Sequence, residues 1–128
     1  MVSLLIVSHS GQIAAGIKEL ADQMTGGGVP IAAAGGTADG RLGTSPDLIL
    51  AAFKSISSSD GVLVLVDLGS AILSAEHALE HVHLPMRLSN APLVEGTILA
   101  AVEAAAGGDL QRTADAAERA RELKKIGG

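Results

Sequence analysis

Short apolar runs alternate with longer amphipathic stretches along the whole sequence. Residues 2–7 are apolar except for Ser3, and in residues 61–66 only Val and Leu follow Gly61. Continuous apolar runs of this length are typical of strands that are buried on both faces of a sheet. Residues 29–34 and 86–89 form two weaker runs. The pattern therefore predicts four strands.

Helical periodicity occupies the segments between these runs. The first segment places four large aliphatic side chains on one helical stripe: Ile13, Ile17, Leu20 and Met24. Ser45 and Pro46 match an N-cap followed by a proline at the first helical position, and Asp109 matches the N-cap of a last helix. The predicted helices cover residues 11–24, 46–57, 70–81, 92–106 and 109–126.

This alternation of strands and helices predicts an α/β fold with one parallel sheet that helices cover on both faces. The length of 128 residues suits one domain, which we expect to span residues 1–128. Ligands of such sheets bind at the carboxyl ends of the strands. The chemistry should therefore lie in the residues that follow each strand.

Composition and charge exclude several classes of function. The net charge is −5, no basic stripe precedes the C-terminal segment, and Phe53 is the one aromatic residue, so nucleic-acid binding is not expected. The absence of cysteine excludes disulfides, thiolate catalysis and cysteine-ligated zinc. The sequence has neither a signal-peptide pattern nor an apolar stretch long enough to span a membrane, so we expect a cytoplasmic protein.

Two titratable residues stand at strand ends. His9 follows the first strand and Asp67 follows the third. A neutral imidazole is a good nucleophile near neutral pH, and a carboxylate that accepts the Nδ1 proton leaves Nε2 free to attack. The simpler interpretations are a histidine that only bonds a carbonyl group and an aspartate that only caps the following helix. The functional and structural interpretations of His9 are about equally supported by the pattern alone.

A phosphoryl group on His9 would need hydrogen-bond donors rather than a metal or a bound cofactor. Gly69 and Ser70 begin a predicted helix, whose free N–H groups favour an anion. The hydroxyl groups of four residues are further candidates: Ser8, Ser10, Thr44 and Ser70. No Lys or Arg is adjacent to His9, and such weak binding of the phosphoryl group suits a carrier that must release it.

Other motifs are weaker or absent. The sequence lacks the P-loop, dinucleotide-binding and nucleophile-elbow signatures. His77 and His81 are four residues apart, with His83 just beyond, but neighbouring glutamates make this segment look like an ordinary solvated helix face. No metal site is predicted.

Four segments resemble the phosphoryl-carrier (DhaM) subunits of phosphotransferase-system-dependent dihydroxyacetone kinases, which have the mannose-type EIIA fold. These segments are residues 1–10, 39–45, 66–76 and 91–96. The resemblance implies a sheet of order 2-1-3-4 and a homodimer. It also implies that His9 carries the phosphoryl group, that Asp67 orients His9, and that three residues contact the phosphate: Gly69, Ser70 and Thr44. Ser10 is predicted as a further phosphate contact from its hydroxyl group next to His9.

The resemblance further implies a phosphotransferase activity and its partners. His9 would receive a phosphoryl group from phospho-HPr and pass it to ADP bound on the DhaL subunit, which acts with DhaK on dihydroxyacetone. Many family members carry additional HPr-like and enzyme-I-like domains. Since this sequence ends after one domain, we expect it to depend on separate donors.

Three alternatives remain open from the sequence. The first is a IIA domain that feeds the IIB component of a mannose-type sugar transporter, although residues 69–76 match the kinase subunit better. The second is a regulatory module whose His9 phosphorylation state another protein reads. A small-molecule enzyme is the weakest alternative, since no acid–base residues beyond His9 and Asp67 are evident.

Overall fold

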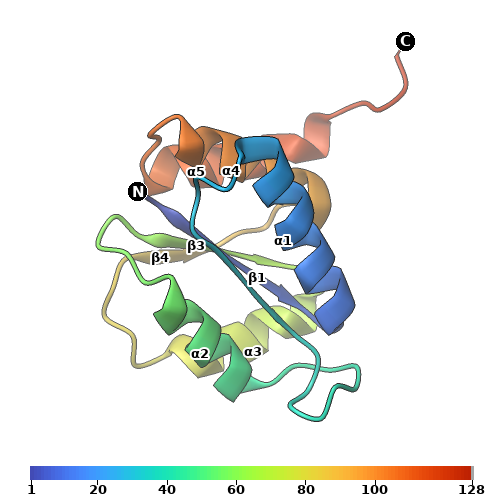
Figure 1. The fold of residues 1–128 in the computed structure, drawn as a ribbon, viewed down its shortest axis with the longest axis vertical. Coiled ribbons are helices and arrows are strands. Elements are labelled where there is room, and N and C mark those ends of the chain that lie inside the picture. The colour runs from blue at the N-terminus through green and yellow to red at the C-terminus, as the bar shows by residue number, and fades with distance from the viewer. Residues whose placement is uncertain (128) are drawn as a thin grey trace.

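The computed structural model describes residues 1–127 and confirms the α/β class. Figure 1 shows a sheet between two layers of helices. The strands are β1 (Ser3–Ser8), β2 (Ile31–Gly35), β3 (Val62–Val66) and β4 (Met86–Leu88). The helices are α1 (Gly11–Thr25), α2 (Pro46–Ser55), α3 (Gly69–Leu79), α4 (Leu93–Ala105), α5 (Leu110–Arg119) and the 3-10 turn η1 (Ala120–Glu122).

The sheet has the strand order β2-β1-β3-β4, and all three pairings are parallel. The expected order 2-1-3-4 is therefore confirmed. In the registers of β1, Ser8 lies opposite Gly35 and Val7 lies opposite Val66. Continued by one residue, this register sets Asp67, the residue after β3, opposite Ser8, so that Asp67 lies beside the turn that carries His9.

The two central strands are buried because both of their faces are covered. Leu4 and Ile6 face one core cluster, under α1, α4 and α5, whereas Leu5 and Val7 face the other, under α2 and α3. All four side chains are fully buried. This two-sided burial explains why the strands read as continuous apolar runs instead of alternating ones.

The predicted inward stripe of α1 is partly wrong. The buried side chains of this helix are Ala14, Ile17 and Ala21. Small side chains let α1 lie close to the sheet, so three of the four predicted stripe residues lie on the flank of the helix and are exposed: Ile13, Leu20 and Met24. Only Ile17 was placed correctly.

The last helix is shorter than the predicted 109–126. Asp109 caps it as expected, and its side chain accepts a hydrogen bond of 2.8 Å from the backbone N–H of Arg112. The α-helix ends at Arg119, however, and no residue of the described segment 121–127 is buried. Without an apolar face to bury, this segment gains no tertiary stabilisation that would extend the helix.

One close backbone approach fixes the edge of the sheet where the site lies. A Cβ atom added to Gly35, at the end of β2, would lie 2.4 Å from the carbonyl oxygen of Ser10. The turn between β1 and α1 therefore rests directly on the backbone of β2. A larger residue at position 35 would displace the segment that carries His9.

We predict opposite effects for the same substitution at two glycines. Gly35→Ala should lower the free energy of unfolding by about 1–3 kcal/mol, because the added methyl group overlaps backbone that has little room to move. Gly16→Ala in α1 is the matched control, since an added Cβ there meets no atom within 4 Å and alanine favours a helix by roughly 0.5–1 kcal/mol. Urea unfolding of both variants measures the difference. Equal stabilities would contradict the inferred close contact.

Candidate functional site

The site forms where β1 and β3 end, and the local structure on both sides of His9 holds it in place. β1 ends at Ser8, and Ser10 already caps α1, its hydroxyl accepting a hydrogen bond of 3.2 Å from the N–H of Ile13. His9 thus occupies the short turn between a buried strand and a helix cap. The N–H of Gly43 donates to the carbonyl group of His9 at 2.8 Å and adds a third anchor from the β2–α2 loop.

Asp67 contacts both the backbone and the ring of His9. Its Oδ1 lies 3.0 Å from His9 Nδ1, and its Oδ2 accepts from the backbone N–H of His9 at 2.9 Å. Since a carboxylate can only accept here, Nδ1 carries the proton and Nε2 presents its lone pair. The structure thus brings together the two residues that the sequence singled out.

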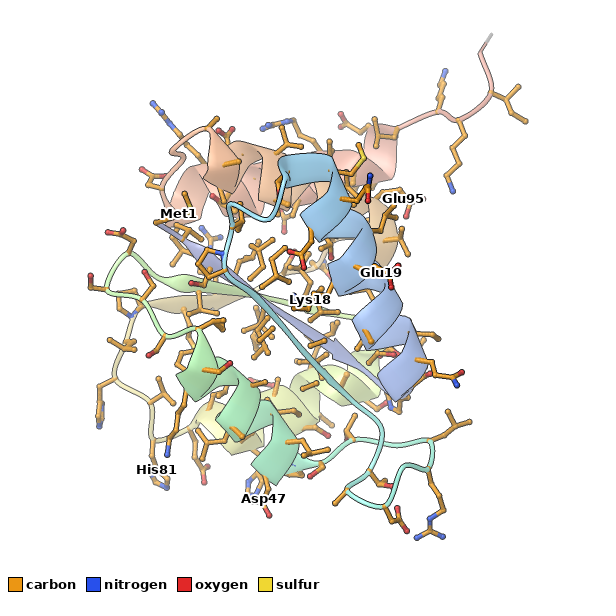
Figure 2. The ribbon with its side chains drawn as sticks, viewed as in Figure 1. Met1, Lys18, Glu19, Asp47, His81 and Glu95 are labelled. Atoms are coloured by element: carbon orange, nitrogen blue, oxygen red, sulfur yellow. The ribbon has the colours of Figure 1, made fainter. Side chains whose placement is uncertain are left out.

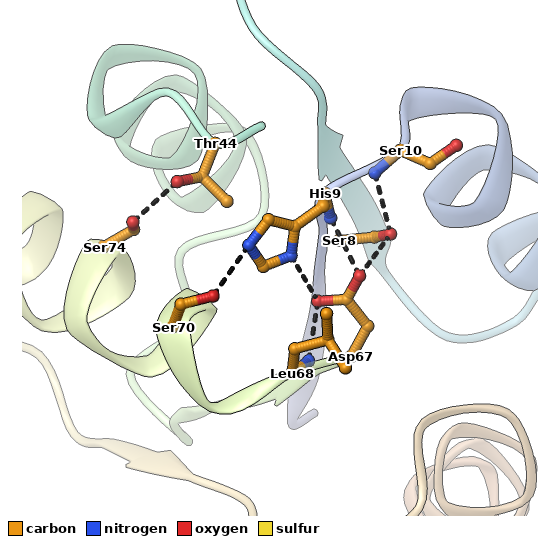
Figure 3. Close-up of polar contacts among 8 residues, drawn as sticks. All are labelled: Ser8, His9, Ser10, Thr44, Asp67, Leu68, Ser70 and Ser74. Atoms are coloured by element: carbon orange, nitrogen blue, oxygen red, sulfur yellow. Dashed lines mark hydrogen bonds and ion pairs between the residues drawn. The ribbon is translucent and has the colours of Figure 1, made fainter. Parts of the chain in front are cut away.

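The Asp67 carboxylate is held by four hydrogen bonds. Besides the two from His9, Ser8 Oγ donates to Oδ2 at 2.9 Å and the N–H of Leu68 donates to Oδ1 at 2.7 Å (Figure 3). Burial by itself raises the pKa of Asp67, but the hydrogen bonds from His9, Ser8 and Leu68 outweigh it and lower the pKa below its ordinary value. The carboxylate is therefore ionised at neutral pH.

The opposite edge of the imidazole faces the start of α3. Ser70 Oγ lies 2.8 Å from His9 Nε2, as Figure 3 shows. With the proton on Nδ1, the hydroxyl group of Ser70 donates to Nε2. Gly69 and Ser70 form the first turn of α3, and among the described residues no side chain caps this helix end. Its free N–H groups make the Nε2 side of the ring suitable for an anion.

The other predicted phosphate contacts lie in different places. Thr44 is on the Nε2 side of the ring, where its hydroxyl group bonds that of Ser74 at 2.6 Å. Ser10 lies on the Asp67 side, away from Nε2, and its hydroxyl group caps α1. Ser8 is fully buried and bonds Asp67, so its expected role as a phosphate donor is wrong. The position of Ser8 at the end of a continuous apolar run already indicated that its side chain would be buried rather than available to a phosphate.

The charged neighbour that contacts the imidazole is Asp67, and the side chain of His9 is 28% exposed. Arg41, in the neighbouring β2–α2 loop, forms an ion pair of 2.9 Å with Asp39. On the Nε2 side the ring meets the Ser70 hydroxyl group and the first turn of α3, and Arg121 lines a pocket together with Asp67 and Gly69.

The histidines near the end of α3 do not form a second site. Because α3 ends at Leu79, His77 and His81 do not share a helix face as their spacing suggested. His81 projects outward (Figure 2) and is 94% exposed. Among the described residues, no group of three potential metal ligands comes together. Nor does any described helix combine the length and apolar character that a membrane span requires.

Comparison with known proteins agrees with this fold. Residues 3–114 match the family model EIIA-man, described as the PTS system fructose IIA component. A solved structure of the unknown function protein EF1359 superposes with a TM-score of 0.78, with 38% identity over 91% of this chain and 92% of that one.

Several curated relatives are phosphoryl donor subunits DhaM of PEP-dependent dihydroxyacetone kinases. Those of Klebsiella michiganensis and Escherichia coli are 42% and 43% identical over 98% of this chain. The chain spans only 28% of the length of these two proteins. A shorter DhaM, from Listeria innocua, is 42% identical over 80% of this chain and 86% of its own length. The chain therefore belongs to the EIIA-man family of the phosphotransferase system, together with the DhaM subunits.

Proposed function

We propose that the chain is a cytoplasmic phosphoryl carrier of a dihydroxyacetone kinase, and that it carries the group as phosphohistidine on His9 without a bound metal or cofactor. The observation that supports this most directly is the contact of 3.0 Å between His9 Nδ1 and Asp67, which leaves Nε2 as the nucleophile. The DhaM relatives support the kinase as the setting. We propose that residues 1–128 act as one EIIA-man domain, of which Gly128 lies outside the described residues.

In the proposed transfer, the Nε2 lone pair attacks the phosphorus of the donor's phosphohistidine. The P–N bond of the donor breaks, and its electron pair returns to the donor imidazole. The proton on His9 Nδ1 stays in place, and Asp67 stabilises the positive charge that develops on the ring. Nucleophilic attack requires that Ser70 release Nε2, after which its hydroxyl group can donate to a phosphoryl oxygen.

The proposed acceptor step follows from the weak hold on the phosphoryl group. The free N–H groups at Gly69 and Ser70, and the nearby Thr44 hydroxyl group, would contact the oxygens without neutralising them. Hydroxyl and N–H donors hold the group more loosely than an ion pair would, so a partner that brings positive charge would stabilise the transition state. ADP bound on a partner protein with its own cations fits this requirement.

We propose phospho-HPr as the donor and DhaL with bound ADP as the acceptor, with DhaK in the same pathway. The chain would thus be the phosphohistidine carrier of a phosphoenolpyruvate–glycerone phosphotransferase. Delivery to the IIB component of a sugar transporter is the alternative, and the DhaM relatives weigh against it. A regulatory role for phosphorylated His9 requires the same chemistry and is separated from transfer by the acceptor assay below.

We also propose a homodimer. Two neighbouring helices expose aliphatic side chains that a second copy could cover: Ile13, Leu20 and Met24 of α1, and Val94 and Val102 of α4. Burying such side chains is favourable at about 25 cal/mol per Å² of apolar surface.

Phosphoryl transfer can be followed directly by intact-mass measurement. After incubation with enzyme I, HPr and phosphoenolpyruvate, we expect the wild-type chain to gain one acid-labile phosphoryl group on His9 and to lose it when DhaL with ADP is added. His9→Ala should gain none and stay folded, because the side chain is partly exposed at a strand end and contributes little to the core. His81→Ala, at an exposed histidine, is the control that should behave like the wild type. Gain without loss to DhaL would favour a transporter or regulatory partner, and full transfer by His9→Ala would refute the carrier site.

Asp67→Asn should slow phosphoryl uptake by about 10–100-fold without abolishing it. The amide no longer enforces the Nδ1–H tautomer, but the free energy difference between tautomers is small enough that some productive rings remain. Asp47→Asn, at an exposed aspartate in the first turn of α2, is the matched control and should leave the rate unchanged. An unchanged uptake rate in Asp67→Asn would remove this carboxylate from the mechanism.

Light scattering after gel filtration should give the mass of two chains at micromolar concentration. Leu20→Lys in α1 should shift the protein toward monomers, since it places a charge among the exposed aliphatic residues of the two helices. Leu84→Lys changes a similarly exposed leucine before β4 and should leave the dimer intact. A monomeric wild-type protein would contradict the homodimer.

A further inference from the structure

The last residue of β1, Ser8, carries a buried hydroxyl group next to the site. The residue is 0% exposed, and its hydroxyl group lies between the turn that carries His9 and the Asp67 carboxylate (Figure 3). We propose that Ser8 is a positioning residue for phosphoryl transfer, acting through Asp67 on the tautomer and orientation of His9. This inference rests on the proposed function of His9 as the phosphoryl carrier.

The hydrogen bonds of Ser8 give its hydroxyl group a single orientation. Ser8 Oγ accepts from the backbone N–H of Ser10 at 3.0 Å, and it donates its proton to Asp67 Oδ2 at 2.9 Å. Because the N–H of Ser10 can only donate and the carboxylate of Asp67 can only accept, the O–H bond must point toward Asp67. An O–H bond that pointed toward Ser10 would break both of these hydrogen bonds.

This orientation fixes the plane of the carboxylate. Oδ2 receives hydrogen bonds from Ser8 and from the backbone N–H of His9, while Oδ1 receives those from His9 Nδ1 and the N–H of Leu68. With two donors on each oxygen, rotation of the carboxyl group would break several charge-assisted hydrogen bonds at once. Among these donors, the Ser8 hydroxyl group and the His9 ring are the two that belong to side chains.

Removal of the Ser8 hydroxyl group would weaken the hold on the Asp67 carboxylate and on the turn next to His9. Asp67 Oδ2 would lose one donor, so the carboxylate could turn away from the line between Oδ1 and Nδ1. The N–H of Ser10 would lose its acceptor in the turn next to His9. Both changes reduce the preference for the Nδ1–H tautomer, which alone presents a free Nε2 to the phosphorus.

Ser8 does not act by binding the phosphoryl group. Its side chain lies on the Asp67 side of the imidazole, whereas Nε2 faces Ser70 on the other side. A buried hydroxyl group on the far side of the ring cannot contact the oxygens of a group on Nε2. Its influence must therefore pass through Asp67.

The test compares three variants of β1. Ser8→Ala removes the hydroxyl group, Ser8→Thr retains it, and Ser3→Ala is the matched control, because Ser3 is buried to 1% exposure at the other end of the same strand. Two quantities are measured on each folded protein: the rate of phosphoryl uptake from phospho-HPr, and the tautomer populations of His9 from the ¹⁵N chemical shifts of its ring nitrogens. The second readout reports on the ring itself, so a general loss of stability does not change it.

We expect Ser8→Ala to slow uptake by about tenfold, the usual effect of removing a group that orients a reactive residue. The population of the Nε2–H tautomer should rise in the same variant. Ser8→Thr should recover most of both properties, and Ser3→Ala should match the wild type.

A folded Ser8→Ala protein with the wild-type uptake rate and tautomer populations would overturn the proposal. So would a folded Ser8→Thr protein that is as impaired as Ser8→Ala, because the hydroxyl group would then not be the cause. If Ser8→Ala fails to fold, Ser8→Cys, whose thiol is a weak donor of similar size, is interpreted by the same criteria. Failure of the wild-type protein to take up a phosphoryl group would contradict the carrier function, whereas the tautomer populations would still decide the role of Ser8.

Discussion

The hydrogen bonds on the Asp67 carboxylate are the interaction on which the site depends. They join the ends of β1 and β3 through the backbone and ring of His9, the hydroxyl group of Ser8 and the N–H of Leu68. The same bonds lower the pKa of Asp67 despite its partial burial, so the acceptor stays ionised and Nδ1 stays protonated. The Asp67 carboxylate thus joins the two strand ends and, by staying ionised, also keeps Nε2 of His9 unprotonated.

The scaffold holds this geometry from several sides. Parallel pairing of β1 with its two neighbours sets the two strand ends side by side, and Gly35 lets the backbone of β2 support the turn that carries His9. The bond from the N–H of Gly43 to the carbonyl group of His9 adds the β2–α2 loop to this support. A nucleophile held on several sides loses little entropy in the transition state, which would favour the proposed phosphoryl transfer.

The hydrogen-bond donors on the Nε2 side of His9 suit the proposed carrier role. Nε2 faces a hydroxyl group and the first turn of α3, while the nearby Arg41 forms an ion pair with Asp39. Neutral donors hold a phosphoryl group more weakly than a fixed cation does. Under the proposed function, this chain aligns the nucleophile and a partner supplies positive charge.

The sequence by itself determined the α/β class, the positions of the strands, and the candidates His9 and Asp67, because buried parallel strands are continuous apolar runs and sites follow strand ends. It could not determine which face of α1 is buried or where the last helix ends, since packing decides both. Nor could it distinguish the roles of Ser8, Ser10 and Ser70, which look alike as hydroxyl residues near strand ends. Only the tertiary structure placed Ser8 against Asp67, Ser10 at the cap of α1 and Ser70 on Nε2 of His9. The reason is that side-chain direction at a strand end depends on register and local backbone geometry rather than on residue type.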